Sequence, residues 1–158
     1  MSITSERVMN QNPGQYFRAG AGAVILNDSG LIFAIERKAV PGAWQLPQGG
    51  LDANEEPLQA VYRELLEETG IRANDLELVT QYPEPLVYEL PPEYRKAKTG
   101  RGQVHYWFIF RYKGDEKQID LSGEAEAATW QWMAFEDLLK LVAPFRKRVY
   151  RRLYDFVC

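Results

Sequence analysis

The stretch GGLDANEEPLQAVYRELLEETGI, residues 49–71, constrains the fold more than any other part of the chain. Two glycines open it as a loop. Pro57 is typical of the first turn of a helix, and Gly70 of the residue that follows its last turn. Between them, apolar side chains recur at helical spacing and form one arc made of Leu58, Val61, Tyr62, Leu65 and Leu66. The stretch therefore predicts a helix over residues 56–69.

Three glutamates of this predicted helix share a side. Glu64, Glu67 and Glu68 are spaced i, i+3 and i+4, which brings their carboxylates together beside the apolar arc. Each like-charge pair at this spacing costs a few tenths of a kcal/mol, so the cluster invites a cation such as Mg²⁺. Arg63, one turn before Glu67, could orient that carboxylate. The competing interpretation is an ordinary solvated helix face.

The same residues resemble the Nudix box, which is a glycine, five residues, a glutamate, seven residues and then Arg-Glu-apolar-x-Glu-Glu-x-Gly-apolar. Every specified position is matched, by Gly49, Glu55, Arg63, Glu64, Leu65, Glu67, Glu68, Gly70 and Ile71. Nine matches at fixed spacing over 23 residues are too specific to be a chance resemblance. The resemblance implies an α+β fold, the Nudix-type α/β/α sandwich with a mixed β-sheet and a catalytic loop-helix-loop.

The resemblance also implies a Mg²⁺ site, with Mn²⁺ as a substitute. Glu64, Glu67 and Glu68 would be the catalytic metal ligands, assisted by a backbone carbonyl near Gln48 or Gly49, while Glu55, Arg63, Gly49 and Gly70 would be structural. Such metals would neutralise phosphate charge, activate water for in-line attack and stabilise the leaving phosphate. A distant glutamate would join the metals or activate the water. We assign it to Glu126, with Glu124 as its substitute, and leave open whether Glu68 or Glu126 activates the water.

The rest of the chain reads as mixed strands and helices. A hairpin is predicted from strands at residues 18–27 and 31–35, with a loop region around residues 40–50. Further elements are expected as strands at residues 76–82, 86–90, 103–112 and 129–133 and as helices at residues 135–141 and 144–156. Alternating positions of the 103–112 strand are apolar on both sides, as in a central strand covered on two faces.

Length and composition limit the class of protein. A chain of 158 residues, 46% hydrophobic and 26% charged, fits a single domain over residues 1–158, with residues 1–15 as a flexible segment. We expect neither a membrane span nor a secretory signal. One cysteine favours a reducing cytoplasm, and a single histidine leaves carboxylates as the metal ligands. No obligatory protein partner is indicated.

Flanking segments extend the resemblance. Residues 44–50, WQLPQGG, and 102–108, GQVHYWF, are similar to the bacterial RNA pyrophosphohydrolases and the plant-type diadenosine polyphosphate hydrolases. In this sequence, their substrate contacts would be Arg18, Trp44, Gln48, Tyr88, Phe145, Arg146 and Lys147. Phe145 could equally be a core residue, and the core interpretation is preferred for Tyr150. His105 is expected to be a strand residue and not a catalytic base.

Three functions remain in competition. The leading one is Mg²⁺-dependent hydrolysis of a pyrophosphate linkage, in the 5′-triphosphate end of RNA or in a dinucleoside polyphosphate. The second is a housekeeping hydrolase of modified nucleoside triphosphates or nucleotide sugars, which residues 44–50 and the basic residues 146–152 disfavour. The third is a non-catalytic domain that binds nucleotide or RNA, from which loss of metal-ligand glutamates would be expected.

Overall fold

The computed structural model describes residues 16–121 and 126–158, so the segment 1–15 expected to be flexible lies outside it, as does Glu124. The strands are β1 (Phe17–Leu26), β2 (Ile32–Arg37), β3 (Trp44–Gln45), β4 (Gln48–Gly50), β5 (Leu76–Gln81), β6 (Leu86–Glu89), β7 (Gly102–Tyr112) and β8 (Ala127–Met133). The α-helices are α2 (Pro57–Thr69), α3 (Phe135–Leu141) and α4 (Lys147–Val157). Short 3₁₀ turns are η2 (Ala73–Asp75), η3 (Pro92–Tyr94), η4 (Glu116–Gln118) and η5 (Pro144–Arg146).

The sheet is mixed, as the sequence predicts. β1 and β7 run parallel at its centre, in register from Phe17 opposite Gly102 to Leu26 opposite Arg111. The remaining pairings are antiparallel: β7 with β5 and β6, β1 with β2 and β4, and β2 with β3 and β8. Parallel strands buried on both faces need apolar side chains in both directions, and β7 supplies them.

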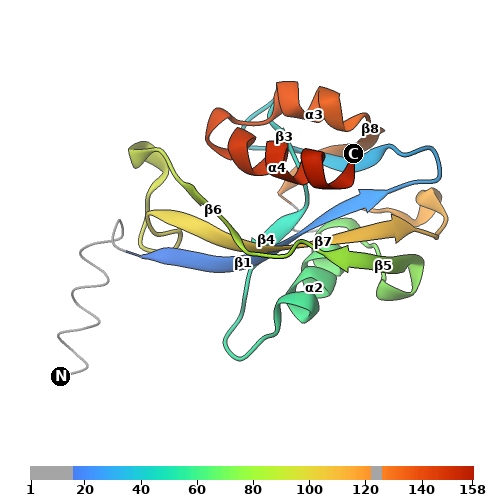
Figure 1. Cartoon of the computed structure of the whole chain (residues 1–158), viewed down its shortest axis with the longest axis horizontal. Coiled ribbons are helices and arrows are strands. Elements are labelled where there is room, and N and C mark those ends of the chain that lie inside the picture. The colour runs from blue at the N-terminus through green and yellow to red at the C-terminus, as the bar shows by residue number, and fades with distance from the viewer. Residues whose placement is uncertain (1–15, 122–125) are drawn as a thin grey trace.

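Helices cover the two faces of this sheet (Figure 1). α2 lies on one side, and α3 and α4 lie together on the other. On β7, Trp107 and Ile109 join the core beneath α3 and α4, whereas Phe108 and Phe110 join the core beneath α2. The predicted central strand with two apolar faces is confirmed, and the architecture is the expected α/β/α sandwich.

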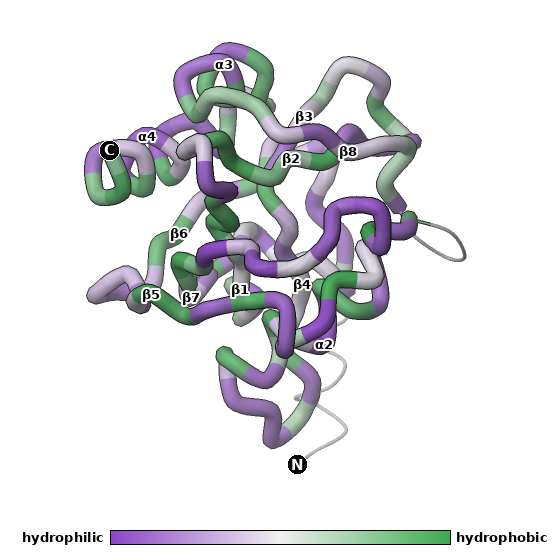
Figure 2. Tube along the Cα trace, turned by 90° about the vertical axis from the view of Figure 1, so that its right-hand side faces the viewer, coloured by the Kyte–Doolittle hydropathy of each residue, from purple (hydrophilic) through white to green (hydrophobic). Residues whose placement is uncertain are grey.

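The C-terminal helix α4 packs on the sheet through the apolar side chains that it contributes to one of the two cores. α4 buries Val149, Tyr150 and Leu153 against the sheet and leaves its polar side chains outside. The Tyr150 hydroxyl accepts a hydrogen bond from the Leu46 backbone N–H at 2.9 Å, so Tyr150 is a core residue, as expected. In Figure 2, β2 is mainly hydrophobic, while α3 and α4 alternate between hydrophilic and hydrophobic residues. In the part of the chain described, no helix has the length and apolar character needed to cross a membrane.

Two local expectations need correction. The loop region predicted before the helix contains two short strands, and one of them, β4, pairs with β1 through Gly20 opposite Gly50. Leu66 belongs to the apolar arc by spacing but is 53% exposed, because it lies at the edge of the face that α2 turns to the sheet. Ala60 and Thr69 are buried there in addition to the predicted residues.

Candidate active site

The site is built on α2 and on β4, the strand just before it. Pro57 occupies the first turn of α2, and the Gln59 side chain accepts a hydrogen bond from the Glu56 backbone N–H at 3.0 Å. Gly70 ends the helix in the left-handed conformation, with φ of 72°, which a residue with a Cβ rarely adopts. Both ends of the helix are therefore fixed locally, and the glutamates between them have defined positions.

Glu64 lies directly against β4. A Cβ added to Gly49 would be 2.1 Å from Cδ of Glu64 and 2.5 Å from its Oε1, closer than non-bonded atoms approach. Only glycine at position 49 lets this carboxylate lie over the strand. Burial is the main cause of a raised pKa for Glu64, opposed by the guanidinium of Arg63.

Arg63 holds the carboxylates in place. Its Nε and Nη2 donate to both oxygens of Glu55, at 2.8 and 3.0 Å, and Nη2 also donates to the Gly50 carbonyl at 2.9 Å. Nη1 reaches Glu64 at 2.9 Å and Glu67 at 3.3 Å. Hydrogen bonding to Arg63 lowers the pKa of Glu55 to about 2, so Glu55 stays charged and fixes the guanidinium.

Glu68 and Glu126 come together although they are far apart in sequence. Burial raises the pKa of the Glu68 carboxyl to about 7, and the negative charges of Glu64, Glu126 and Glu67 contribute, while the Arg37 guanidinium opposes the rise. The backbone carbonyl of Glu126 accepts from Lys38 N at 2.9 Å, which ties this segment to the end of β2. Glu126 is exposed beside the half-buried Glu68.

The donor chemistry suits a hard divalent cation. The carboxylates of Glu64, Glu67 and Glu126 all lie close enough to act on that of Glu68, and such oxygens are the ligands that magnesium and manganese prefer. Within residues 16–121 and 126–158, no three acidic, histidine or cysteine side chains enclose a cation position, and Glu64 and Glu67 both pair with Arg63. A bound cation would compete with Arg63 for these oxygens.

An aromatic cluster, formed by Tyr88 and Phe145 with the Arg146 guanidinium, lies next to this site and is joined to it through Gln48. The Gln48 amide donates to the Tyr88 hydroxyl at 3.1 Å, and that hydroxyl donates to Gln103 Oε1 at 2.6 Å. The rings of Tyr88 and Phe145 have centroids 5.7 Å apart. The Arg146 guanidinium lies 4.6 Å from the Phe145 centroid and 5.5 Å from that of Tyr88. Gln48 immediately precedes Gly49, so neighbouring residues of β4 contact the aromatic cluster and the Glu64 carboxylate.

Arg18 and His105 lie between the carboxylates and the aromatic rings. The Arg18 guanidinium lies over Gly50, where an added Cβ would be 2.2 Å from its Nη2. Its positive charge lowers the pKa of Glu64 and of His105, so it is close to both. Burial, then Arg146 and Arg18, lower the pKa of His105 to about 3. A buried neutral imidazole between two cations agrees with a structural strand residue and not with a general base.

Two of the expected substrate residues make no hydrogen bond, ion pair or ring contact with this cluster in the part of the chain described. Trp44 is partly buried against the core beneath α3 and α4. In the described residues, no ring contact or hydrogen bond joins it to Tyr88 or Phe145. Lys147, at the start of α4, is exposed to solvent.

Two residues of the site were not singled out from the sequence. Arg37 opposes the pKa rise of Glu68 and follows a β-bulge between β2 and β8. Gln103 accepts from Tyr88, although its strand was quoted for the resemblance. The signal for Gln103 was its place in the segment at residues 102–108 quoted for the resemblance, whereas Arg37 depends on a bulge that spacing does not predict.

Known proteins resemble this chain over most of its length. A family model described as NUDIX domain matches residues 16–153. An RNA pyrophosphohydrolase of Cereibacter sphaeroides is 40% identical over 142 residues, covering 87% of this chain and 88% of the relative. Nudix hydrolase 26, chloroplastic, of Arabidopsis thaliana is 33% identical over 153 residues, covering 90% and 70%.

Solved structures share the fold. A C. elegans Ap4A hydrolase binary complex superposes with a TM-score of 0.68 at 23% identity, covering 89% of this chain and 97% of that one. The E. coli dihydroneopterin triphosphate pyrophosphohydrolase gives a TM-score of 0.71 at 20% identity, covering 87% and 97%. Enzymes of the matched family generally need a divalent metal. The chain belongs to the Nudix family and is a pyrophosphohydrolase that cleaves phosphorus-containing anhydrides.

Proposed function

We propose that this enzyme removes phosphate from the 5′-triphosphate end of RNA in a Mg²⁺-dependent reaction, acting as one domain in the cytoplasm. The observation that carries the proposal is the continuous arrangement of carboxylates, Arg18 and aromatic cluster, joined through β4. A nucleotide bound with its base at Tyr88 and Phe145 can direct its phosphates past Arg18 toward Glu64. RNA is favoured because the relatives with 36–40% identity are named RNA pyrophosphohydrolases.

The carboxylates of α2 would hold the metal. Glu64, Glu67 and Glu68 are its ligands in this proposal, Glu126 approaches from the β8 side, and Mn²⁺ can replace Mg²⁺. The bound metal supplies charge neutralisation and a more acidic water. Arg63 orients Glu64 and Glu67, and Gly49 leaves room for Glu64. Positioning of this kind is worth a large part of the rate in phosphoryl transfer.

Proton transfer has two candidates. Glu68 is half-buried, with a pKa of about 7 in the metal-free protein, and Glu126 is exposed beside it. Either carboxylate can accept the proton of the attacking water while that water is directed in line at phosphorus. The neutral His105 has no part in this transfer because burial keeps its pKa near 3.

Substrate recognition would come from the residues of the aromatic cluster. A base stacked on an aromatic ring gains roughly 1–3 kcal/mol with little preference for its identity. Phe145 is only partly buried and offers such a surface, whereas Tyr88 and Arg146 are buried and support its ring. Gln48 in turn positions the Tyr88 ring. Arg18 and the exposed Lys147 would meet phosphates. Trp44 would act indirectly, by supporting the segment that leads to Gln48.

A dinucleoside polyphosphate is the second candidate substrate. It presents the same base, ribose and phosphate chain to the aromatic cluster, and the fold is shared with a C. elegans Ap4A hydrolase. A head-to-head assay with Mg²⁺ separates the two, with 5′-triphosphate RNA, diadenosine tetraphosphate and free nucleotides compared at equal concentration and products identified. The proposal expects the highest kcat/KM for RNA, with release of phosphate or pyrophosphate. A higher kcat/KM for diadenosine tetraphosphate or a free nucleotide would contradict it.

A further inference from the structure

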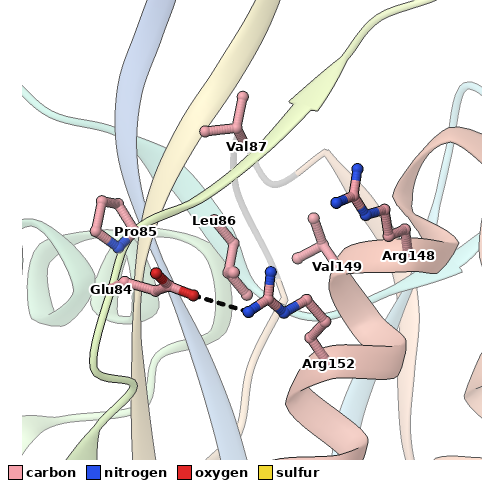
Figure 3. A pocket seen from close by; sticks show the side chains of 7 residues that line it. All are labelled: Glu84, Pro85, Leu86, Val87, Arg148, Val149 and Arg152. Atoms are coloured by element: carbon pink, nitrogen blue, oxygen red, sulfur yellow. Dashed lines mark hydrogen bonds and ion pairs between the residues drawn. The ribbon is translucent and has the colours of Figure 1, made fainter.

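A cavity lies between α4 and the segment that contains β6. It has a volume of about 190 Å³ and is lined by Glu84, Pro85, Leu86, Val87, Arg148, Val149 and Arg152. Figure 3 shows the two arginines extending from α4 on one side, with residues 84–87 on the other. None of these residues belongs to the proposed catalytic site.

The cavity carries positive charge that the protein does not fully neutralise. Arg152 donates to Glu84 across it at 2.8 Å (Figure 3). Arg148 is exposed, and within the described residues its guanidinium has no ion pair or side-chain hydrogen bond. A cation left unpaired at the rim of a groove attracts an anion, and arginine suits phosphate because of its planar set of donors.

The lining of the cavity is adjacent in sequence to the aromatic cluster. Along β6, Tyr88 points inward to Phe145, while Val87, next to it, is 50% exposed and lines the new cavity. Along α4, Arg148 follows two residues after Arg146, which stacks on both rings of the cluster. The residues that line the cavity are therefore neighbours along the chain of those that would hold the base.

We propose that this groove binds the phosphodiester backbone of single-stranded RNA, downstream of the nucleotide whose base the aromatic cluster holds. The inference rests on the proposed function and adds the RNA body to the substrate determinants. A diadenosine polyphosphate has all its phosphates on the catalytic side of the base and places none in the groove. Arg148 then gives selectivity for RNA over dinucleotides without taking part in hydrolysis.

The test compares Arg148→Glu with Arg151→Glu. Both substitutions reverse one exposed positive charge on α4, but Arg151 does not line the cavity and pairs with Asp155 instead. Each variant is assayed on a 5′-triphosphate RNA of eight nucleotides, on one of two nucleotides and on diadenosine tetraphosphate. Melting temperatures check that both variants fold.

Arg148→Glu should lower kcat/KM for the eight-nucleotide RNA by about tenfold or more, as loss of a charged contact implies. It should change kcat/KM for the other two substrates by less than about twofold. The slope of log binding constant against log salt concentration for the eight-nucleotide RNA should become shallower by about 0.7. Equal losses of kcat/KM on the long and short RNAs, or equal effects of the two variants, would contradict RNA binding in the groove and leave the proposed function untouched. A wild-type enzyme that does not process triphosphate RNA would overturn the proposed function together with RNA binding in the groove.

Discussion

Replacing Gly49 with alanine should disable the site without unfolding the protein. The added methyl would lie 2.1 Å from Cδ of Glu64, whereas ordinary contact begins at 3.4 Å. The Glu64 carboxyl group must therefore move by about 1.3 Å, the difference of these two distances. Gly49 has no positive φ, so alanine adds no backbone strain of its own.

The size of the effect follows from that displacement. A misplacement of about 1 Å in a catalytic site can cost about a hundredfold in rate, and overpacking costs about 1–3 kcal/mol in stability. We expect kcat/KM to fall by about two orders of magnitude, with a higher concentration of Mg²⁺ needed for half-maximal activity. Steady-state kinetics over a metal titration, with urea denaturation in parallel, measures both quantities.

Gly30→Ala serves as the control for lost stability. Gly30 has φ of 78° and no neighbouring atom within 4 Å of an added Cβ, so alanine there is strained but touches nothing in the site. It should lower the free energy of unfolding and leave kcat/KM unchanged. If Gly49→Ala kept kcat/KM within about twofold of wild type, the close approach of Gly49 to Glu64 would not position a metal ligand.

Three further results are expected. Phe145→Ala should raise KM about 5- to 150-fold through lost base stacking, with little change in kcat in steady-state assays, and an unchanged KM would place Phe145 in the core alone. Glu55 has a lowered pKa of about 2, so its stabilising pair with Arg63 is complete above pH about 4.5 and is lost as pH falls toward 2. Urea midpoints of wild type and Glu55→Gln should therefore differ at pH 6 and converge near pH 2. Tyr150→Phe leaves the buried Leu46 N–H unpaired and should cost about 1–3 kcal/mol in urea denaturation. Tyr154→Phe should cost much less, because the hydroxyl of this partly buried tyrosine donates only to the exposed Glu136.

Local sequence signals predicted the catalytic helix because its determinants are local. The spacing of Glu64, Glu67 and Glu68, the proline at the start and the glycine at the end all act within four turns of chain. The longer strands were predicted for the same reason, since apolar runs and alternation are properties of neighbouring residues, whereas the short β3 and β4 were not predicted. Most element ends differ from expectation by one or two residues, and α4 begins three residues later than expected because residues 144–146 form the 3₁₀ turn η5.

Contacts between distant segments could not be predicted in this way. The proximity of Arg37 to Glu68 depends on the β2–β8 pairing and on the bulge within it. The contact of Gly49 with Glu64 depends on how far β4 extends over α2, and the exposure of Leu66 depends on where the sheet ends above the helix. These features come from packing, which spacing along the chain does not specify.

Turnover of Glu68→Gln on 5′-triphosphate RNA with Mg²⁺ is the most direct test of the site. Glutamine keeps the shape of the side chain but removes its charge, and Glu77→Gln, at an exposed ion pair on β5, is the matched control. We predict that Glu68→Gln loses turnover by orders of magnitude while it melts like wild type, and that Glu77→Gln stays fully active. Wild-type turnover by Glu68→Gln would contradict the assignment of Glu68 to the metal site.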